Sequence, residues 1–210
     1  MRGEGEPDET SLIRGLATVD GVSTVVAGLL LTPGASAGRD HRTLVALEAA
    51  LAPLPVRRID FPNRIAGSRA PDRPGPAVAH LRAQADDFAA ELGVPPEQIA
   101  LGGRSFGGRM SSVAVAEGQP AAALVLLSYP LHPPGRPETL RVEHLPSVHV
   151  PVLAVSGERD PFGSPDELVE HLARVGGPLT TVFVPGDHSP ADDGPVCAAV
   201  VDWLRALRPA

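Results

Sequence analysis

The sequence predicts an α/β domain in which a mostly parallel central sheet is covered by helices on both faces. Short apolar runs rich in valine and leucine alternate with segments of helical periodicity along most of the chain, which is the pattern of strand–helix–strand units. The length of 210 residues suits one large domain. Hydrophobic residues make up 43% and charged residues 20%, as in a globular protein. Because aromatic residues make up only 3%, the core must be built from aliphatic side chains.

The N-terminal region predicts a short lead followed by the first strands. Residues 1–10 are acidic and polar, unlike a signal peptide, and we expect them to form a flexible lead before a single domain over residues 11–210. Residues 12–19 are a candidate first strand. The continuous apolar run at 25–31 indicates a strand buried on both faces. A loop of small residues follows at 32–38.

The next part of the chain alternates helix and strand. Residues 41–51 have apolar side chains at helical spacing, and residues 56–61 indicate a short strand. Residues 62–76 contain several Pro, Gly and Arg residues and are expected to form an irregular surface loop. A helix is then predicted over 78–92, with Gly93 as its stop signal.

The second half continues this alternation. It adds four predicted strands, at 99–101, 121–127, 150–155 and 179–184. A helix with a Ser-Pro start signal is expected at 164–174, and a last helix at 195–207, where Asp192 and Asp193 fit the N-terminal cap. Residues 130–149, rich in Pro and His, form a long excursion.

The segment Gly103-Arg104-Ser105-Phe106-Gly107 fits the pattern G-x-S-x-G, and it lies between a predicted strand and a predicted helix. A nucleophilic serine must stand exposed at such a sharp turn, so its neighbours must be small enough for close backbone packing. The N-terminus of the following helix points its positive dipole end at charge that develops in the reaction. A glycine-rich turn of this kind also binds phosphate without doing chemistry, so the motif alone leaves that alternative open.

Three loops follow predicted strands and carry the remaining candidate groups. In an open α/β sheet, functional groups gather at the carboxyl ends of the strands. The acid-bearing loop 156–162, the histidine-bearing loop 185–190 and the small-residue loop 33–35 are therefore expected to lie beside Ser105. The order Ser, Asp, His along the chain is the order of an α/β-hydrolase.

The chain resembles the small, cap-less dienelactone-hydrolase-like group of the α/β-hydrolase superfamily, over about residues 25–207. Similar motifs occur at residues 103–109, 127–132, 157–161 and 186–188. The resemblance implies an α/β-hydrolase fold with no large cap domain. Two departures matter. Pro33-Gly34-Ala35 stands where such proteins often have His-Gly-Ala, and Ser105 stands where dienelactone hydrolases proper have cysteine, so that enzyme's substrate is not carried over.

Chemistry assigns the roles expected of these residues. Ser105 would attack an acyl carbon, and His188 would act as its base and then as the acid that protonates the leaving group. Asp160 would hold the imidazole in the required tautomer and stabilise the imidazolium. The backbone N–H groups of Phe106 and Ala35 would bind the oxyanion. Backbone donors do not depend on side-chain type, so the missing histidine of the loop need not abolish this site.

Several residues compete for these roles. Glu158 is the substitute for Asp160 in the same loop. His188 has six rivals, at positions 41, 80, 132, 144, 149 and 171, but it alone combines the end of the last strand with a Gly-Asp-His-Ser sequence. Arg104 and Arg109 either bind an anionic substrate or, as is commoner, pair with acids or face solvent.

These observations predict a serine hydrolase acting on a carboxylic ester or thioester, with a catalytically silent α/β-hydrolase-fold scaffold or binding protein as the alternative. The net charge of −7 argues against a nucleic-acid partner, and the complete absence of lysine excludes Schiff-base chemistry. No apolar run is long enough for a membrane span. We therefore expect a small-molecule acyl substrate, no membrane partner, no cofactor, no metal and a cytoplasmic location, which the single Cys197 suits.

Overall fold

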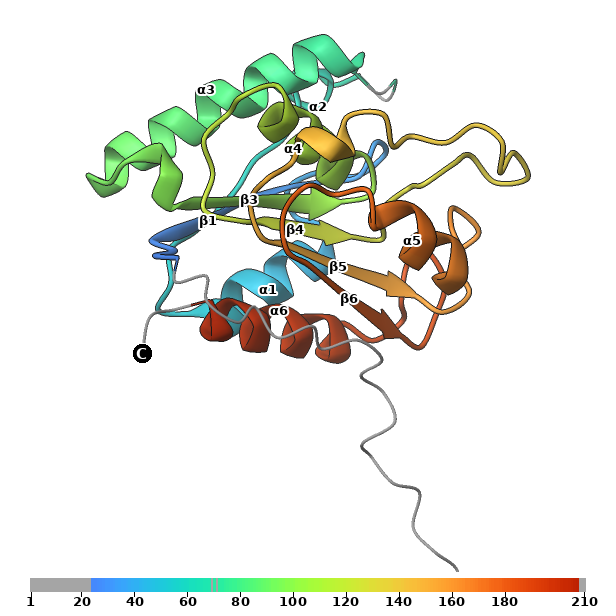
Figure 1. Cartoon of the computed structure of the whole chain (residues 1–210). Helices are drawn as coiled ribbons and strands as arrows, with labels where there is room; N and C mark the ends of the chain where they lie inside the picture. Colours follow the sequence, from blue (N-terminus) through green and yellow to red (C-terminus); the bar gives the residue numbers. More distant parts are fainter. Residues whose placement is uncertain (1–23, 69, 71, 208–210) are drawn as a thin grey trace, which may run out of the picture.

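Six parallel strands form one sheet in the computed structural model, which describes residues 24–68, 70 and 72–207 (Figure 1). The strands are β1 (Gly28–Thr32), β2 (Val56–Arg58), β3 (Ile99–Arg104), β4 (Leu124–Leu127), β5 (Val152–Gly157) and β6 (Leu179–Val184). Their spatial order is β2-β1-β3-β4-β5-β6, and every neighbouring pair is parallel. All carboxyl ends therefore lie along one edge of the sheet, where the candidate loops were expected.

Helices cover both faces of this sheet, as the sequence predicted (Figure 1). They are α1 (Arg42–Leu51), α2 (Pro62–Ile65), α3 (Pro74–Leu92), α4 (Phe106–Ala116), α5 (Pro165–Leu172) and α6 (Gly194–Ala206). Strand side chains alternate between the two faces. Leu29 and Leu31 pack in a core with α1 and α6, whereas Leu30 packs in a second core with α3, α4 and α5.

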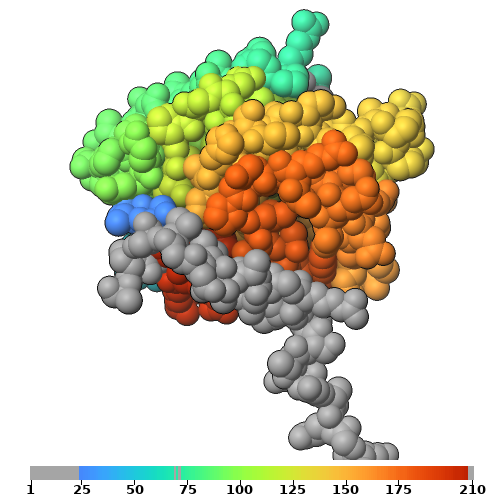
Figure 2. All heavy atoms as spheres, in the orientation of Figure 1, coloured from blue at the N-terminus to red at the C-terminus, as the bar shows by residue number. Residues whose placement is uncertain are grey.

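The excursion at 130–149 contains one short 3-10 helix, Leu145–Ser147, and no other regular structure. The beginning of the excursion is tied to its middle, because the buried Tyr129 hydroxyl donates to the Arg141 carbonyl at 2.6 Å and the Arg141 N–H donates to the Leu131 carbonyl at 2.9 Å. In the space-filling view the excursion adds a projection to the surface rather than a separate domain (Figure 2). The described chain carries no large cap.

Several predicted boundaries differ from the structure. Residues 62–76 were expected to be irregular, but they contain α2 and the first turn of α3. Both helices have a proline at their first positions, where its fixed φ suits a helix and its missing N–H costs nothing. The proline-rich composition of this segment therefore marks helix starts as well as loops. The Gly93 stop is confirmed, with φ of 66° in the left-handed region.

Three strands are shorter at one end than predicted, whereas β3, predicted over 99–101, runs on to Arg104. The strand expected at 25–31 begins at Gly28, the one at 56–61 ends at Arg58, and the one at 121–127 begins at Leu124. An apolar run continues beyond the paired backbone because most of the flanking residues still pack in the core, although Val25 is exposed. The candidate strand at 12–19 and the lead at 1–10 lie outside the described residues.

The predicted cap of the last helix is wrong for Asp193 but right for Asp192, whose side chain accepts the first N–H of α6. Asp193 occupies the N-cap position of α6, but its side chain does not bond the helix backbone. Instead it accepts from the Thr43 hydroxyl at 2.6 Å and pairs with Arg42 at 3.0 Å, which ties α6 to α1. Asp192 accepts from the Gly194 N–H at 2.8 Å. No helix in the described ranges has the length and apolar character of a membrane span.

Candidate active site

Ser105 lies at the sharp turn between β3 and α4, as the motif predicts. Its φ of 51° and ψ of −116° are unusual for a residue with a side chain and carry a conformational cost. Its N–H donates to the Leu127 carbonyl of β4 at 2.8 Å, which fixes the turn against the sheet. The strained backbone is thus held by its neighbours, and the serine hydroxyl stands at the carboxyl edge.

The glycines of the motif allow α4 to lie directly on the ends of β1 and β3. A Cβ atom at Gly103 or Gly107 would collide with Thr32, and one at Gly108 would lie only 2.6 Å from the Gly103 carbonyl oxygen. Thr32 is itself fully buried, and its hydroxyl donates to the Gly102 carbonyl at 2.9 Å. Small residues are therefore required here by backbone contact and not only by the turn.

Asp160 lies in the loop after β5, with its side chain fully shielded from solvent. A buried carboxylate is costly unless hydrogen bonds satisfy it. The Phe162 N–H donates to Asp160 Oδ1 at 2.9 Å, and the imidazole of His188 faces both oxygens. The loop thus holds the Asp160 carboxylate in one orientation toward the imidazole of His188.

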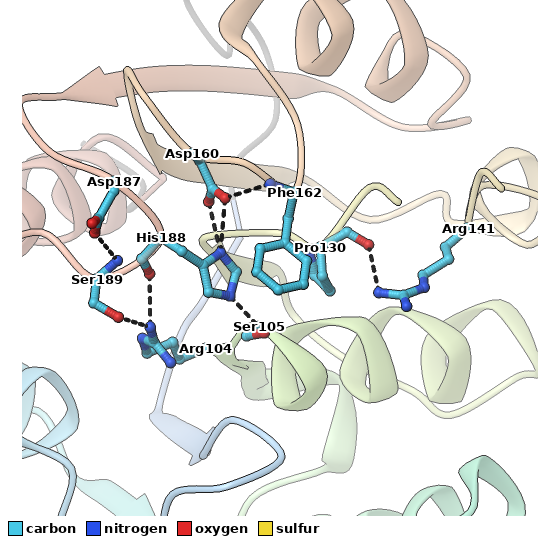
Figure 3. Close-up of polar contacts among 9 residues, drawn as sticks. All are labelled: Arg104, Ser105, Pro130, Arg141, Asp160, Phe162, Asp187, His188 and Ser189. Atoms are coloured by element: carbon cyan, nitrogen blue, oxygen red, sulfur yellow. Dashed lines mark hydrogen bonds and ion pairs between the residues drawn. The ribbon is translucent and has the colours of Figure 1, made fainter. Parts of the chain in front are cut away.

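His188 follows β6 and connects Asp160 to Ser105 (Figure 3). Its Nδ1 lies 2.8 Å from Asp160 Oδ2 and 3.0 Å from Oδ1, while its Nε2 lies 2.9 Å from Ser105 Oγ. The carboxylate is an acceptor only, so Nδ1 must carry the proton, which leaves the Nε2 lone pair facing the serine hydroxyl. The Phe162 ring packs on the imidazole, with centroids 4.1 Å apart. Three residues from three loops thereby form one line of hydrogen bonds.

The loop after β1 also reaches the nucleophile. A Cβ built on Gly34 would lie 3.7 Å from Ser105 Cβ, so this loop borders the serine. Phe106 is the first residue of α4, where a helix leaves its N–H without an internal partner. Within the described chain, neither the Phe106 N–H nor the Ala35 N–H donates to a backbone carbonyl.

The competing residues lie elsewhere. Glu158, the alternative acid, is exposed. Asp187, which directly precedes His188, accepts from the Ser189 N–H within its own loop. Four of the six other histidines bond groups other than the three candidate residues: His41 caps α1, His80 bonds the Asp60 carbonyl, His132 bonds the Pro133 carbonyl and His144 bonds Ser112. Within the described ranges, no group of three or more His, Cys, Asp or Glu side chains is arranged to hold a metal ion.

Sequence reasoning missed two contacts of His188. The sequence marks Phe162 only as a member of the acid-bearing loop, although its ring packs on the imidazole and its N–H bonds Asp160. Arg104 was weighed as a substrate-binding residue, but its Nη2 lies 2.7 Å from the carbonyl oxygen of His188 (Figure 3). Neither contact has a sequence signal beyond nearness to a motif residue.

Comparison with known proteins gives a consistent result for the fold. A family model described as an alpha/beta hydrolase domain matches residues 25–193. No curated protein matches the sequence significantly. Among solved structures, Est1E from Butyrivibrio proteoclasticus with bound ferulic acid is similar, with a TM-score of 0.69 and 18% identity over 86% of this chain and 89% of that one.

Two further structures have the same architecture. A dienelactone hydrolase from Anabaena variabilis has a TM-score of 0.65 and 18% identity, over 92% of this chain and 95% of that one. The RedJ thioesterase from Streptomyces coelicolor has a TM-score of 0.62 and 16% identity, over 83% and 84%. At these identities the likeness shows a shared fold.

Proposed function

Because the chain belongs to the α/β-hydrolase family, we propose that it is a serine hydrolase that cleaves a carboxylic ester or thioester through an acyl-enzyme on Ser105. The observation that carries this proposal is the line of hydrogen bonds from Ser105 Oγ through His188 to the buried Asp160. An esterase, a dienelactone hydrolase and a thioesterase among the structural neighbours support the reaction class.

In the first half of the reaction, Ser105 Oγ attacks the carbonyl carbon while His188 Nε2 accepts the hydroxyl proton. Asp160 stabilises the imidazolium that forms. The carbonyl oxygen becomes an oxyanion, which the N–H groups of Phe106 and Ala35 would bind, each donor contributing about 3–4 kcal/mol of transition-state stabilisation. The intermediate collapses when the imidazolium protonates the leaving oxygen or sulfur, and the alcohol or thiol departs.

In the second half, water attacks the acyl carbon and His188 accepts a proton from it. The same two backbone donors would hold the second oxyanion. The imidazolium then returns its proton to Ser105 Oγ, which leaves as the acid product forms. The sum is hydrolysis of one ester or thioester to an acid and an alcohol or thiol, with the enzyme restored.

The described surface favours a small or exposed acyl substrate. The excursion at 130–149 is a loop-sized insertion rather than a cap. A site without a lid has fewer walls to select a long acyl chain. We therefore expect the optimum to fall at short chains.

The test is hydrolysis of p-nitrophenyl esters of increasing chain length by the wild type, Ser105→Ala and His188→Ala. We expect both variants to lose at least about three orders of magnitude in kcat, as removal of a nucleophile or base implies. A serine-directed fluorophosphonate should label the wild type and leave Ser105→Ala unlabelled. Ser112→Ala is the matched control, because its hydroxyl lies on α4 and bonds His144 and the Arg109 carbonyl instead.

Two results together would refute the catalytic role. If the wild type hydrolyses every ester no faster than the two variants, and the fluorophosphonate also fails to label it, the line of hydrogen bonds does not act as a nucleophilic site. The silent scaffold would then be the remaining function for this fold.

A further inference from the structure

Arg104 is the last residue of β3 and directly precedes Ser105. Its half-buried guanidinium lies between the nucleophile turn and the histidine loop. Nη2 donates to the carbonyl oxygen of His188 at 2.7 Å and also bonds the Ser189 hydroxyl, across more than eighty residues of sequence (Figure 3). One side chain therefore joins the residue before the nucleophile to the residue proposed as the base.

The same guanidinium also lies close to the loop after β1. A Cβ on Gly34 would lie 3.1 Å from Arg104 Nη1 and 3.7 Å from Ser105 Cβ. Glycine at this position lets the loop carrying the Ala35 N–H pack closely against the arginine. Arg104 thus borders all three parts of the site: the nucleophile turn, the histidine loop and the proposed oxyanion loop.

The guanidinium of Arg104 lies among charges of both signs, and the neighbouring Arg42 adds to the effect of burial on its pKa. Burial lowers the pKa of its guanidinium, and the carboxylates of Asp160, Asp187 and Asp193 oppose that effect. A planar guanidinium presents donors in a fixed fork, so it can hold two acceptors in one geometry. Its Nη2 donors are engaged by His188 and Ser189, which leaves this side of the group unavailable to an anionic substrate.

We propose that Arg104 is a positioning residue that holds the backbone of His188 and thereby sets the imidazole against Ser105. The carbonyl of His188 belongs to the residue whose ring must meet both Asp160 and Ser105. If that backbone shifts, Nε2 moves away from the hydroxyl although the side chains remain intact. The kinetic consequence rests on the proposed hydrolase function, whereas the position of the imidazole does not.

The test compares Arg104→Gln and Arg104→Lys with Arg82→Gln. Arg82 is a matched control, because its Nη2 also donates to two carbonyls, those of Ala114 and Glu117, at the other end of α4. A misplacement of about 1 Å costs roughly 10²-fold in rate, so we expect Arg104→Gln to lose about that much in kcat on p-nitrophenyl acetate. KM should stay within about twofold, since we place no substrate contact on this residue. Arg104→Lys keeps the charge without the fork and should lose about tenfold.

A second readout does not need activity. In protein with nitrogen-15-labelled histidine, the Nδ1–H proton of His188, bonded to Asp160, gives a far-downfield NMR signal that His188→Asn identifies by its absence. We expect this signal to stay sharp in the wild type, Ser105→Ala and Arg82→Gln, and to broaden or vanish in Arg104→Gln.

The outcomes separate the two proposals. If Arg104→Gln keeps the signal, the positioning role is wrong, whether or not kcat falls. If KM for an anionic ester rises while kcat holds, Arg104 binds substrate and the inference also falls. If neither the wild type nor any variant hydrolyses the esters, the proposed hydrolase function is wrong. The NMR signal alone then still decides the role of Arg104. Should Arg104→Gln not fold, Arg104→Lys decides by the same two readouts.

Discussion

Replacement of Asp160 by asparagine should remove activity without removing the fold. The carboxylate accepts the Phe162 N–H at Oδ1 and faces His188 Nδ1 from Oδ2 at 2.8 Å. An amide in this place must keep its oxygen toward the Phe162 N–H, because its nitrogen cannot accept. Its NH₂ group then faces Nδ1 and donates to it. The imidazole must take the other tautomer, with its proton on Nε2, and can no longer accept the Ser105 proton.

The expected fall in kcat follows from the loss of His188 as a general base. In serine proteases that use the Ser-His-Asp arrangement, exchange of the aspartate for asparagine lowers kcat about 10⁴-fold, equivalent to about 5.5 kcal/mol of barrier. We expect a loss of that order for Asp160→Asn on p-nitrophenyl acetate, measured as kcat. The two side chains have nearly the same shape, so the melting temperature should change little.

Glu158→Gln is the matched control, because it removes one negative charge from the same loop at an exposed position. It should keep wild-type kcat. If Asp160→Asn retains more than about a tenth of wild-type kcat, the tautomer argument is refuted, since tenfold corresponds to only about 1.4 kcal/mol. If Glu158→Gln loses as much as Asp160→Asn, the effect belongs to the charge of the loop and not to the imidazole.

Two further predictions concern stability. A Cβ at Gly107 would collide with Thr32 and the Pro33 carbonyl, so Gly107→Ala should lower the free energy of unfolding, measured by urea denaturation, by at least about 2 kcal/mol. Gly75→Ala is the control and should not lower it, because a Cβ there would have nothing within 4 Å. Equal effects of the two substitutions would contradict the packing argument. Burial, and then the charge of Arg109, lowers the pKa of His144 from 6.5 to about 4, so the folded state binds fewer protons than the unfolded state between these values. The contribution of His144 to the free energy of unfolding is complete above pH 6.5 and declines as the pH falls toward 4. His144→Gln should therefore flatten the slope of unfolding free energy against pH in that window. An unchanged slope would show that other groups set it.

The sequence was sufficient for the parts of the fold that depend on local pattern. Alternating strands and helices predicted a parallel sheet, and the carboxyl-edge rule placed Ser105, Asp160 and His188 together, where the structure has them. The segment 62–76 contains two helix starts where a loop was predicted, because proline is common both in loops and in the first turn of a helix.

The remaining features depend on contacts that no local pattern carries. Arg104 bonds a backbone carbonyl, which every residue possesses, so nothing in the sequence near position 188 marks its partner. Asp193 is of a residue type that commonly caps helices, yet its side chain bonds Thr43 and Arg42 of α1, a helix far away in the sequence. Phe162 becomes part of the site only when the loops after β5 and β6 converge.

The loop that carries His188 follows an edge strand, so it is less stable toward local unfolding than the loops that carry Ser105 and Asp160. Strands β3 and β5, which lead to Ser105 and Asp160, pair on both sides, but β6 pairs only with β5 in the described sheet. An outer strand and the helix after it can detach in a partial opening that costs less free energy than global unfolding. Such an opening would carry His188 away while the nucleophile turn stays folded. Thermal inactivation should then precede the loss of helical circular dichroism, and amide exchange in β6 should be faster than in β3.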